Sequence, residues 1–180
     1  MADFEVSLLI HILSRDLGYS VISISEDLNV IKSASGLRYT AHKKISDVQI
    51  EETLGIIIPG GWMNGVSHEL INIIKKLNAK QKFIAGICSA PWIIAKAGIM
   101  SGKKFTSSIS EWDEEKQKRL CNQDPFEWQN YVDKRIVTDK NIITAKGIAF
   151  IDFSVAVCDY LGAFKNENEK KSFIQQFFPG

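Results

Sequence analysis

Short apolar runs alternate along the chain with segments in which apolar residues recur at helical spacing. Between residues 4 and 17 the apolar residues recur at intervals of three or four positions, which predicts a first helix that ends at Gly18. Residues 54–58 and 83–87 are almost continuously apolar. Runs of this kind are typical of strands that are covered on both faces, as in a parallel sheet.

The remaining segments extend this alternation. Period-two patterns predict a strand over residues 19–24, a small ribbon over 30–40 that turns at Ser35-Gly36, and a hairpin over 131–145 that turns at 139–141. Helical spacing predicts further helices over residues 66–78, 89–97, 111–120, 150–164 and 166–178.

Strands that alternate with helices predict an α/β fold, a three-layer α/β/α sandwich of flavodoxin type with a mostly parallel sheet. No linker or repeat interrupts the pattern, so residues 1–180 are predicted to form one domain. Ligands of such folds bind beyond the carboxyl ends of the strands. Because two predicted strands end at Pro59-Gly60-Gly61 and at Cys88, these two turns are predicted to line one pocket.

Composition narrows the classes of partner and compartment. The net charge of +1 gives no reason to expect a nucleic-acid partner, and no apolar stretch approaches the ~20 residues of a membrane span. The three cysteines, Cys88, Cys121 and Cys158, are far apart and lack metal-ligand spacing. We therefore expect a cytoplasmic protein with a small-molecule substrate or ligand, without a disulfide framework, metal or other cofactor.

Cys88 is the most informative single residue. It follows a predicted strand and precedes small residues, a proline and a predicted helix, an order that displays a nucleophile on a tight turn. The N–H groups and dipole of the helix favour an anion, which predicts a lowered thiol pKa. The alternative is a buried structural thiol. Cys158 lies in an apolar helical run and is predicted to be a core residue, whereas Cys121 has no evident role.

Four segments, taken together, resemble a known family. IIPGG at 57–61, AGICSA at 85–90, AGIMSGKKFT at 97–106 and NIITAKG at 141–147 occur in the order found in the DJ-1/PfpI family of the class I glutamine amidotransferase-like superfamily. The opening ADFE at 2–5 resembles the acidic motif of the bacterial branch named after type 1 glutamine amidotransferases. The resemblance covers roughly residues 2–162.

The resemblance implies a set of site residues. Cys88 would be the reactive residue and Glu5 would contact its sulfur, while backbone groups of Gly60, Gly61 and Ser89 would bind substrate or an oxyanion. A carboxyl group beside a thiolate is driven toward its protonated form and can then donate a hydrogen bond to sulfur. The plainer alternatives are that Glu5 is a surface acid at a helix start and that the glycines only form a tight turn.

Several positions depart from the family pattern. Ser89 stands where protease-like members carry histidine, Ser107 and Ser108 stand where other members supply one, and residues 147–150 offer no late histidine–glutamate pair. Because acyl transfer by cysteine needs a nearby base, these positions argue against peptidase and glutaminase activity. Met1 stands almost where the first family strand should end, so that strand is missing and we expect a truncated or misassigned start.

Three functions stay open. The first is a cysteine-dependent protein acting on small electrophiles or oxidants in a hydrolase, glyoxalase or redox-responsive role. The second is a non-catalytic ligand-binding or interaction protein on the same scaffold, and glutamine-dependent amide transfer ranks last. Trp62 and His68 are candidates for the pocket wall. The apolar residues among 173–178 could form a homodimer contact or cap the domain's own core.

Overall fold

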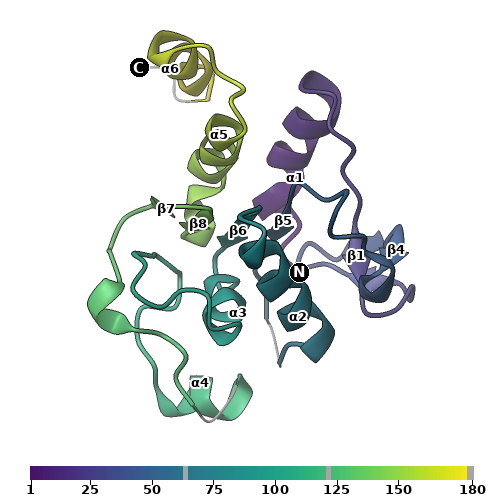
Figure 1. Cartoon of the computed structure of the whole chain (residues 1–180), viewed down its shortest axis with the longest axis vertical. Coiled ribbons are helices and arrows are strands. Elements are labelled where there is room, and N and C mark those ends of the chain that lie inside the picture. Colours follow the sequence, from purple (N-terminus) through teal and green to yellow (C-terminus); the bar gives the residue numbers. More distant parts are fainter. Residues whose placement is uncertain (63–64, 121–122, 178–180) are drawn as a thin grey trace.

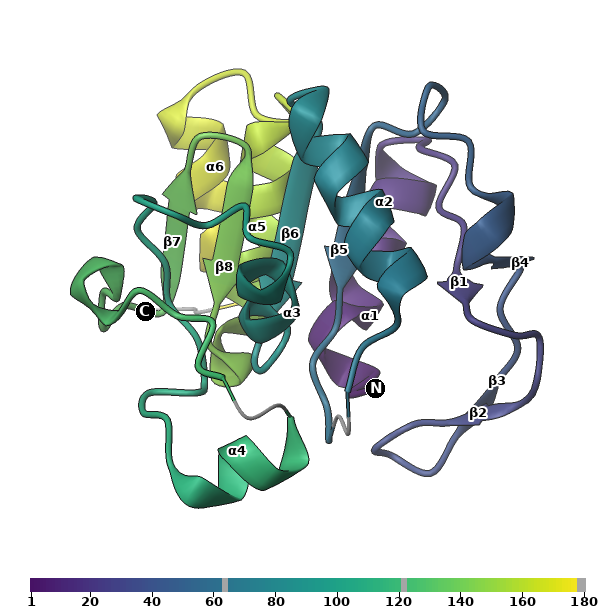
Figure 2. The same cartoon turned by 60° about the horizontal axis from the view of Figure 1, so that its bottom comes forward.

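The computed structural model describes residues 1–62, 65–120 and 123–177 and shows a four-stranded sheet between two layers of helices (Figures 1 and 2). The strand order is β5-β6-β8-β7, in which the first three strands are parallel and β7 runs antiparallel to β8. The strands are β5 (Gly55–Ile58), β6 (Phe83–Ile87), β7 (Ile136–Asp139) and β8 (Ile142–Ala145). The predicted α/β fold with a mostly parallel sheet is thereby confirmed.

Alternation along β6 divides the core into two layers. Phe83, Ala85 and Ile87 pack in one cluster with the first and fifth helices, and Ile84 packs on the opposite face, where Trp92 is fully buried. The helices of the first face are α1 (Phe4–His11) and α5 (Phe150–Tyr160), and those of the second are α2 (His68–Ala79) and α3 (Pro91–Lys96).

The N-terminal third follows the predicted pattern except at one strand. Helix α1 continues as a π-helical turn (Ile12–Asp16), and Gly18 follows with a positive φ. The ribbon over 30–40 is present as β2 (Ile31–Lys32) paired antiparallel with β3 (Arg38–Tyr39). The strand predicted over 19–24 is wrong, because β1 comprises only Ile24–Ser25, paired with β4 (Lys43–Lys44).

The helices predicted over 111–120, 150–164 and 166–178 are present, and each ends earlier than predicted. Helix α4 (Glu114–Arg119) begins with Asp113 as its N-cap, and α6 (Glu167–Gln175) begins with Asn166. Phe173 packs against Phe164 with ring centroids 5.5 Å apart, so this aromatic residue covers the chain's own core. Short helical turns lie at η2 (Ile45–Asp47), η3 (Trp128–Asn130) and η4 (Gly147–Ala149).

Two predictions on single cysteines have different outcomes. Cys158 is fully buried in the α1–α5 layer, as predicted for a core residue, and burial raises its pKa to about 11. Cys121 and Phe178 lie outside the described residues.

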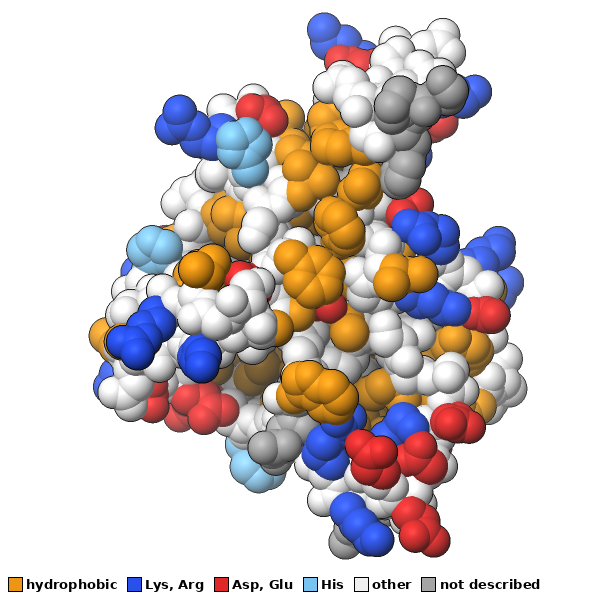
Figure 3. Space-filling view, turned by 180° about the vertical axis from the view of Figure 1, so that it is seen from behind, with side chains coloured by type: hydrophobic (Ala, Val, Ile, Leu, Met, Phe, Trp, Pro, Cys, Tyr) orange, Lys and Arg blue, Asp and Glu red, His pale blue; other side chains and the backbone are white. Residues whose placement is uncertain are grey.

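Hydrophobic side chains form a band on the face seen from behind, and charged side chains surround it (Figure 3). Among the described helices, none has the length and hydrophobicity that crossing a membrane demands.

The first residues are tied to the β2–β3 ribbon through a buried aspartate. The Asp3 carboxylate accepts hydrogen bonds from the Ser35 hydroxyl at 2.7 Å and from the Tyr39 hydroxyl at 3.2 Å. The Ser35 hydroxyl is the main cause that lowers the pKa of Asp3 to about 2. Because Asp3 precedes α1 directly, these bonds fix where that helix begins.

Candidate active site

Cys88 lies between β6 and α3 on a sharply turned backbone. Its φ is +65°, a conformation that residues other than glycine rarely adopt. Its carbonyl accepts hydrogen bonds from the Ser107 hydroxyl and the Ser108 N–H, both at 2.9 Å, and its N–H donates to the Ala145 carbonyl at 2.8 Å. These three bonds hold the turn that the sequence predicts, and the side chain stays partly exposed.

The Glu5 carboxyl reaches the thiol from the first turn of α1. Glu5 is 2% exposed, and it accepts a hydrogen bond from the Gly60 N–H at 2.7 Å. It also hydrogen-bonds with the Cys88 thiol. Burial raises the pKa of Glu5 and outweighs these two hydrogen bonds, which act in the opposite direction. The contact that the family resemblance implies between Glu5 and Cys88 is therefore present.

Two glycines make room for this pair. A Cβ on Gly60 would lie 2.5 Å from the Cys88 Cβ and 2.9 Å from the Glu5 Oε2, closer than Cβ atoms come to other groups. A Cβ on Gly147 would lie 3.1 Å from both the Cys88 Sγ and the Glu5 Oε1. The thiol and the carboxyl therefore meet in a niche whose walls are backbone.

The environment of the thiol raises the pKa of Cys88, so the predicted lowering is wrong. Burial is the largest cause and the negative charge of Glu5 is the second. The Ser108 hydroxyl and the Ser89 N–H favour the thiolate, but they do not outweigh burial and the carboxylate. Helix α3 has only six residues, and the carboxylate in contact with the sulfur opposes its dipole.

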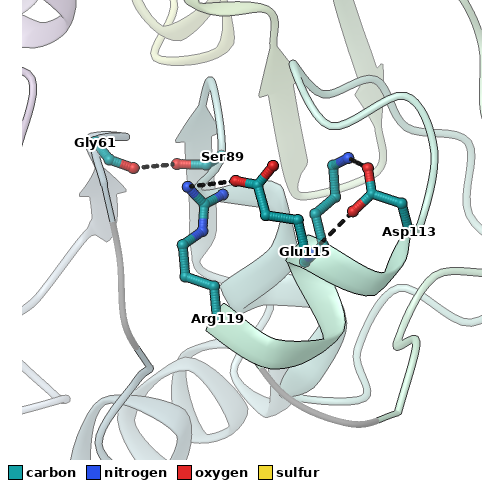
Figure 4. Close-up of polar contacts among 6 residues, drawn as sticks. Gly61, Ser89, Asp113, Glu115 and Arg119 are labelled. Carbon is teal, nitrogen blue, oxygen red and sulfur yellow. Dashed lines mark hydrogen bonds and ion pairs between the residues drawn. The ribbon is translucent and has the colours of Figure 1, made fainter.

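The residues predicted to bind an oxyanion come together, with different roles for their backbone groups. Gly60 uses its N–H to hold the Glu5 carboxyl. The Ser89 hydroxyl donates to the Gly61 carbonyl at 3.0 Å, which joins the two turns across the ends of β5 and β6 (Figure 4). The Pro-Gly-Gly turn and the cysteine turn thus line one site, as the sequence predicts.

Ser108 is a site residue that the sequence indicates only as a position without the family's histidine. Its hydroxyl accepts a hydrogen bond from the Gly147 N–H at 2.9 Å and hydrogen-bonds with the Cys88 thiol. A hydroxyl that accepts from one side can donate its proton to sulfur on the other. Within the described ranges, no three His, Cys, Asp or Glu side chains are grouped as metal ligands would be.

Trp62 and Arg119 lie beside the two turns. Trp62 follows Gly61 directly and is 85% exposed, and the Arg119 guanidinium lies 5.1 Å from the centroid of its ring. His68, the other predicted wall residue, is the first residue of α2 and is exposed.

Comparison with known proteins assigns the family. The sequence model of the DJ-1/PfpI family matches residues 1–159. The chain belongs to the DJ-1/PfpI family. A solved structure of the same fold, the DJ-1 superfamily protein Atu0886 from Agrobacterium tumefaciens, superimposes with a TM-score of 0.80 and is 24% identical over 98% of this chain and 93% of its own.

Curated DJ-1/PfpI relatives carry different names. The chain is 26% identical to the uncharacterized protease YdeA of Bacillus subtilis over 98% of this chain and 86% of that protein. It is 26% identical to deglycase PfpI of Pyrococcus furiosus over 80% of this chain and 82% of that protein. The match to the uncharacterized protein MJ0967 of Methanocaldococcus jannaschii is 33% identical over 62% of this chain and spans about half (53%) of that protein.

Proposed function

We propose that the protein is an enzyme that uses Cys88 to act on small carbonyl electrophiles, in a glyoxalase or deglycase type of reaction. The observation that carries this proposal is the hydrogen bond between the Glu5 carboxyl and the Cys88 thiol, in a niche that Gly60 and Gly147 leave open. A buried carboxylate that touches a partly exposed thiol is poised to move a proton.

Glu5 supplies the base that the absent histidines do not. At neutral pH a thiol with a raised pKa holds its proton, and a neighbouring carboxylate can take that proton as sulfur attacks. Burial raises the pKa of Glu5, which makes it a better proton acceptor than an exposed glutamate. Glu5 therefore acts as the general base, and not as a standing hydrogen-bond donor to a thiolate.

The first step needs no further reactant. The Cys88 Sγ adds to the carbonyl carbon, its proton passes to Glu5, and the π electrons of the C=O bond move to oxygen. Glu5 then returns the proton to that oxygen, which gives a thiohemiacetal and restores the carboxylate. The backbone N–H groups of Gly61 and Ser89 are the proposed donors to the transient oxyanion.

One relative supports this reaction class, and the chemistry of the site argues against peptide cleavage. A relative named as a deglycase aligns with four fifths of the chain. Another relative is named as a protease, but cysteine-dependent cleavage of an amide uses a histidine to protonate the leaving amine. No histidine hydrogen-bonds with Cys88 in the part of the chain that the structure describes.

Turnover of methylglyoxal tests the proposal. We expect wild-type protein to consume it and Cys88→Ala to lose all turnover. Cys158→Ala is the matched control, because it removes a fully buried thiol of the α1–α5 layer to which we assign no role in the reaction, and it should keep turnover. Turnover that survives in Cys88→Ala would refute the proposal.

The competing function is binding without turnover. It is favoured by the serines that stand at the family's histidine positions, since they keep the pocket without an imidazole base. Saturable binding of small carbonyl compounds by wild-type protein with no product formation would decide for this alternative. A redox role would instead appear as oxidation of Cys88 ahead of Cys158 in mass spectra after limited peroxide treatment.

A further inference from the structure

Arg119 has hydrogen-bonding capacity that its described neighbours leave unused. Its side chain is only a quarter exposed, and its Nε is buried without a hydrogen-bond partner among the described residues. Its ion pair with Glu115 is long, at 3.9 Å between Nη1 and Oε1, and the Glu115 side chain is 78% exposed. A buried donor without an acceptor is unfavourable unless a ligand supplies one.

The guanidinium lies beside the two turns of the site. Helix α4 lies beyond the ends of β5 and β6 from which the two turns emerge (Figure 2), and Figure 4 shows Arg119 extending from it toward the Gly61–Ser89 pair. The stack on Trp62 provides a second connection, because Trp62 follows Gly61 directly and Ser89 follows Cys88. Trp62 itself stays 85% exposed, so this stack does not serve to bury it.

We propose that Arg119 binds the carboxylate of a small substrate whose carbonyl carbon reacts at Cys88. The inference rests on the proposed function and adds to it a substrate preference, for small oxo acids over neutral aldehydes of similar size. A guanidinium presents parallel N–H donors that match the two oxygens of a carboxylate. Glu115, weakly paired and exposed, is the carboxylate that the substrate displaces.

Alkylation of Cys88 tests this inference without requiring turnover. Iodoacetate and iodoacetamide react in the same way: a C–S bond forms, the C–I bond breaks, and iodide leaves with the electron pair. The two reagents have nearly the same size, but only iodoacetate carries a carboxylate. The ratio of their rates at Cys88, read by mass spectrometry, cancels any effect of a variant on the pKa of the thiol.

In Arg119→Gln we expect the ratio of iodoacetate to iodoacetamide rates to fall about tenfold, the usual effect of one hydrogen bond to a charged group. In Arg119→Lys the ratio should fall less, because lysine keeps the positive charge and lacks only the parallel N–H donors of the guanidinium. The matched control is Lys118→Gln, which removes the same charge from the neighbouring residue, whose side chain is 80% exposed. Its ratio should change less than about twofold, since solvent screens an exposed charge.

The result that would overturn this inference differs from the result that would overturn the proposed function. Equal ratios in Arg119→Gln and Lys118→Gln would overturn the carboxylate site even where Cys88 reacts rapidly. Iodoacetamide labelling of Cys88 no faster than that of Cys158 would instead refute the reactive thiol. If circular dichroism shows that Arg119→Gln is unfolded, Glu115→Gln replaces it as the test variant. This substitution removes the carboxylate that pairs with Arg119, so the ratio of iodoacetate to iodoacetamide rates should rise. An unchanged ratio would overturn the inference.

Discussion

Replacement of Glu5 by glutamine separates two roles that a carboxyl beside a thiol can have. The variant keeps the shape of the side chain, and its amide oxygen can still accept the hydrogen bond from the Gly60 N–H. It removes the negative charge and the hydrogen bond that raise the pKa of Cys88. It also removes the only proton acceptor that we assign to the reaction. Thiol ionisation and carbonyl turnover should therefore change in opposite directions.

The size of the first effect follows from the contact between the two groups. Two unit charges about 4 Å apart interact by about 1 kcal/mol in water and about 4 kcal/mol near a protein surface. Glu5 is 2% exposed and Cys88 is partly exposed, so we take an intermediate value of about 2 kcal/mol. This free energy corresponds to about a thirtyfold rise in the ionised fraction of the thiol at neutral pH.

The assay is the rate of Cys88 labelling by iodoacetamide between pH 6 and pH 10, measured beside methylglyoxal turnover. We expect Glu5→Gln to label about thirtyfold faster than wild type at neutral pH and to lose at least about a hundredfold in turnover, the usual contribution of a general base. Glu167→Gln is the control for charge alone, because its side chain is 76% exposed on α6. Slower labelling in Glu5→Gln would refute the reasoning, because it would show that Glu5 stabilises the thiolate as a proton donor.

Three further outcomes follow from the contacts of the site. Gly147→Ala should abolish turnover while the protein stays folded by circular dichroism, because a Cβ there meets both the Cys88 Sγ and the Glu5 Oε1 at 3.1 Å. Ser108→Ala should lower the free energy of unfolding in urea by about 1–3 kcal/mol, since the buried Gly147 N–H loses its acceptor. The pKa of Asp3 is lowered from 3.8 to about 2, so its ionised form stabilises the fold above pH 3.8 and this stabilisation is lost as the pH falls through 2. The difference in urea midpoint between wild type and Asp3→Asn should accordingly shrink between pH 5 and pH 2, and a constant difference would contradict this role.

The sequence predicted best those features that depend on neighbouring residues. The strand at Phe83–Ile87 and the turn at Cys88 follow from one continuous segment, so pattern alone located both. The strand predicted over 19–24 was wrong because an alternating pattern does not reveal whether a neighbouring strand is available. Within β1, Ile24–Ser25 pair with Lys43–Lys44. Ordered strands need a neighbour that local sequence does not reveal.

The chemistry of the thiol was harder to predict for the same reason. The direction of the pKa shift at Cys88 depends on burial and on Glu5, a residue 83 positions earlier in the chain, which the sequence indicated only through the family resemblance. Nothing in the polar pattern over 111–120 distinguishes Arg119 from its exposed neighbours. Its contact with Trp62 spans residues that are distant in sequence, and it becomes visible only in the fold.

The positive φ of Cys88 has a consequence for how the chain can change. A left-handed backbone disfavours every side chain and disfavours β-branched ones most, while glycine adopts it freely. Cys88→Gly should therefore be more stable than Cys88→Ala, although neither carries a nucleophile. Selection for stability alone would therefore favour glycine at this position, and the proposed role of the thiol would explain why a cysteine stands there.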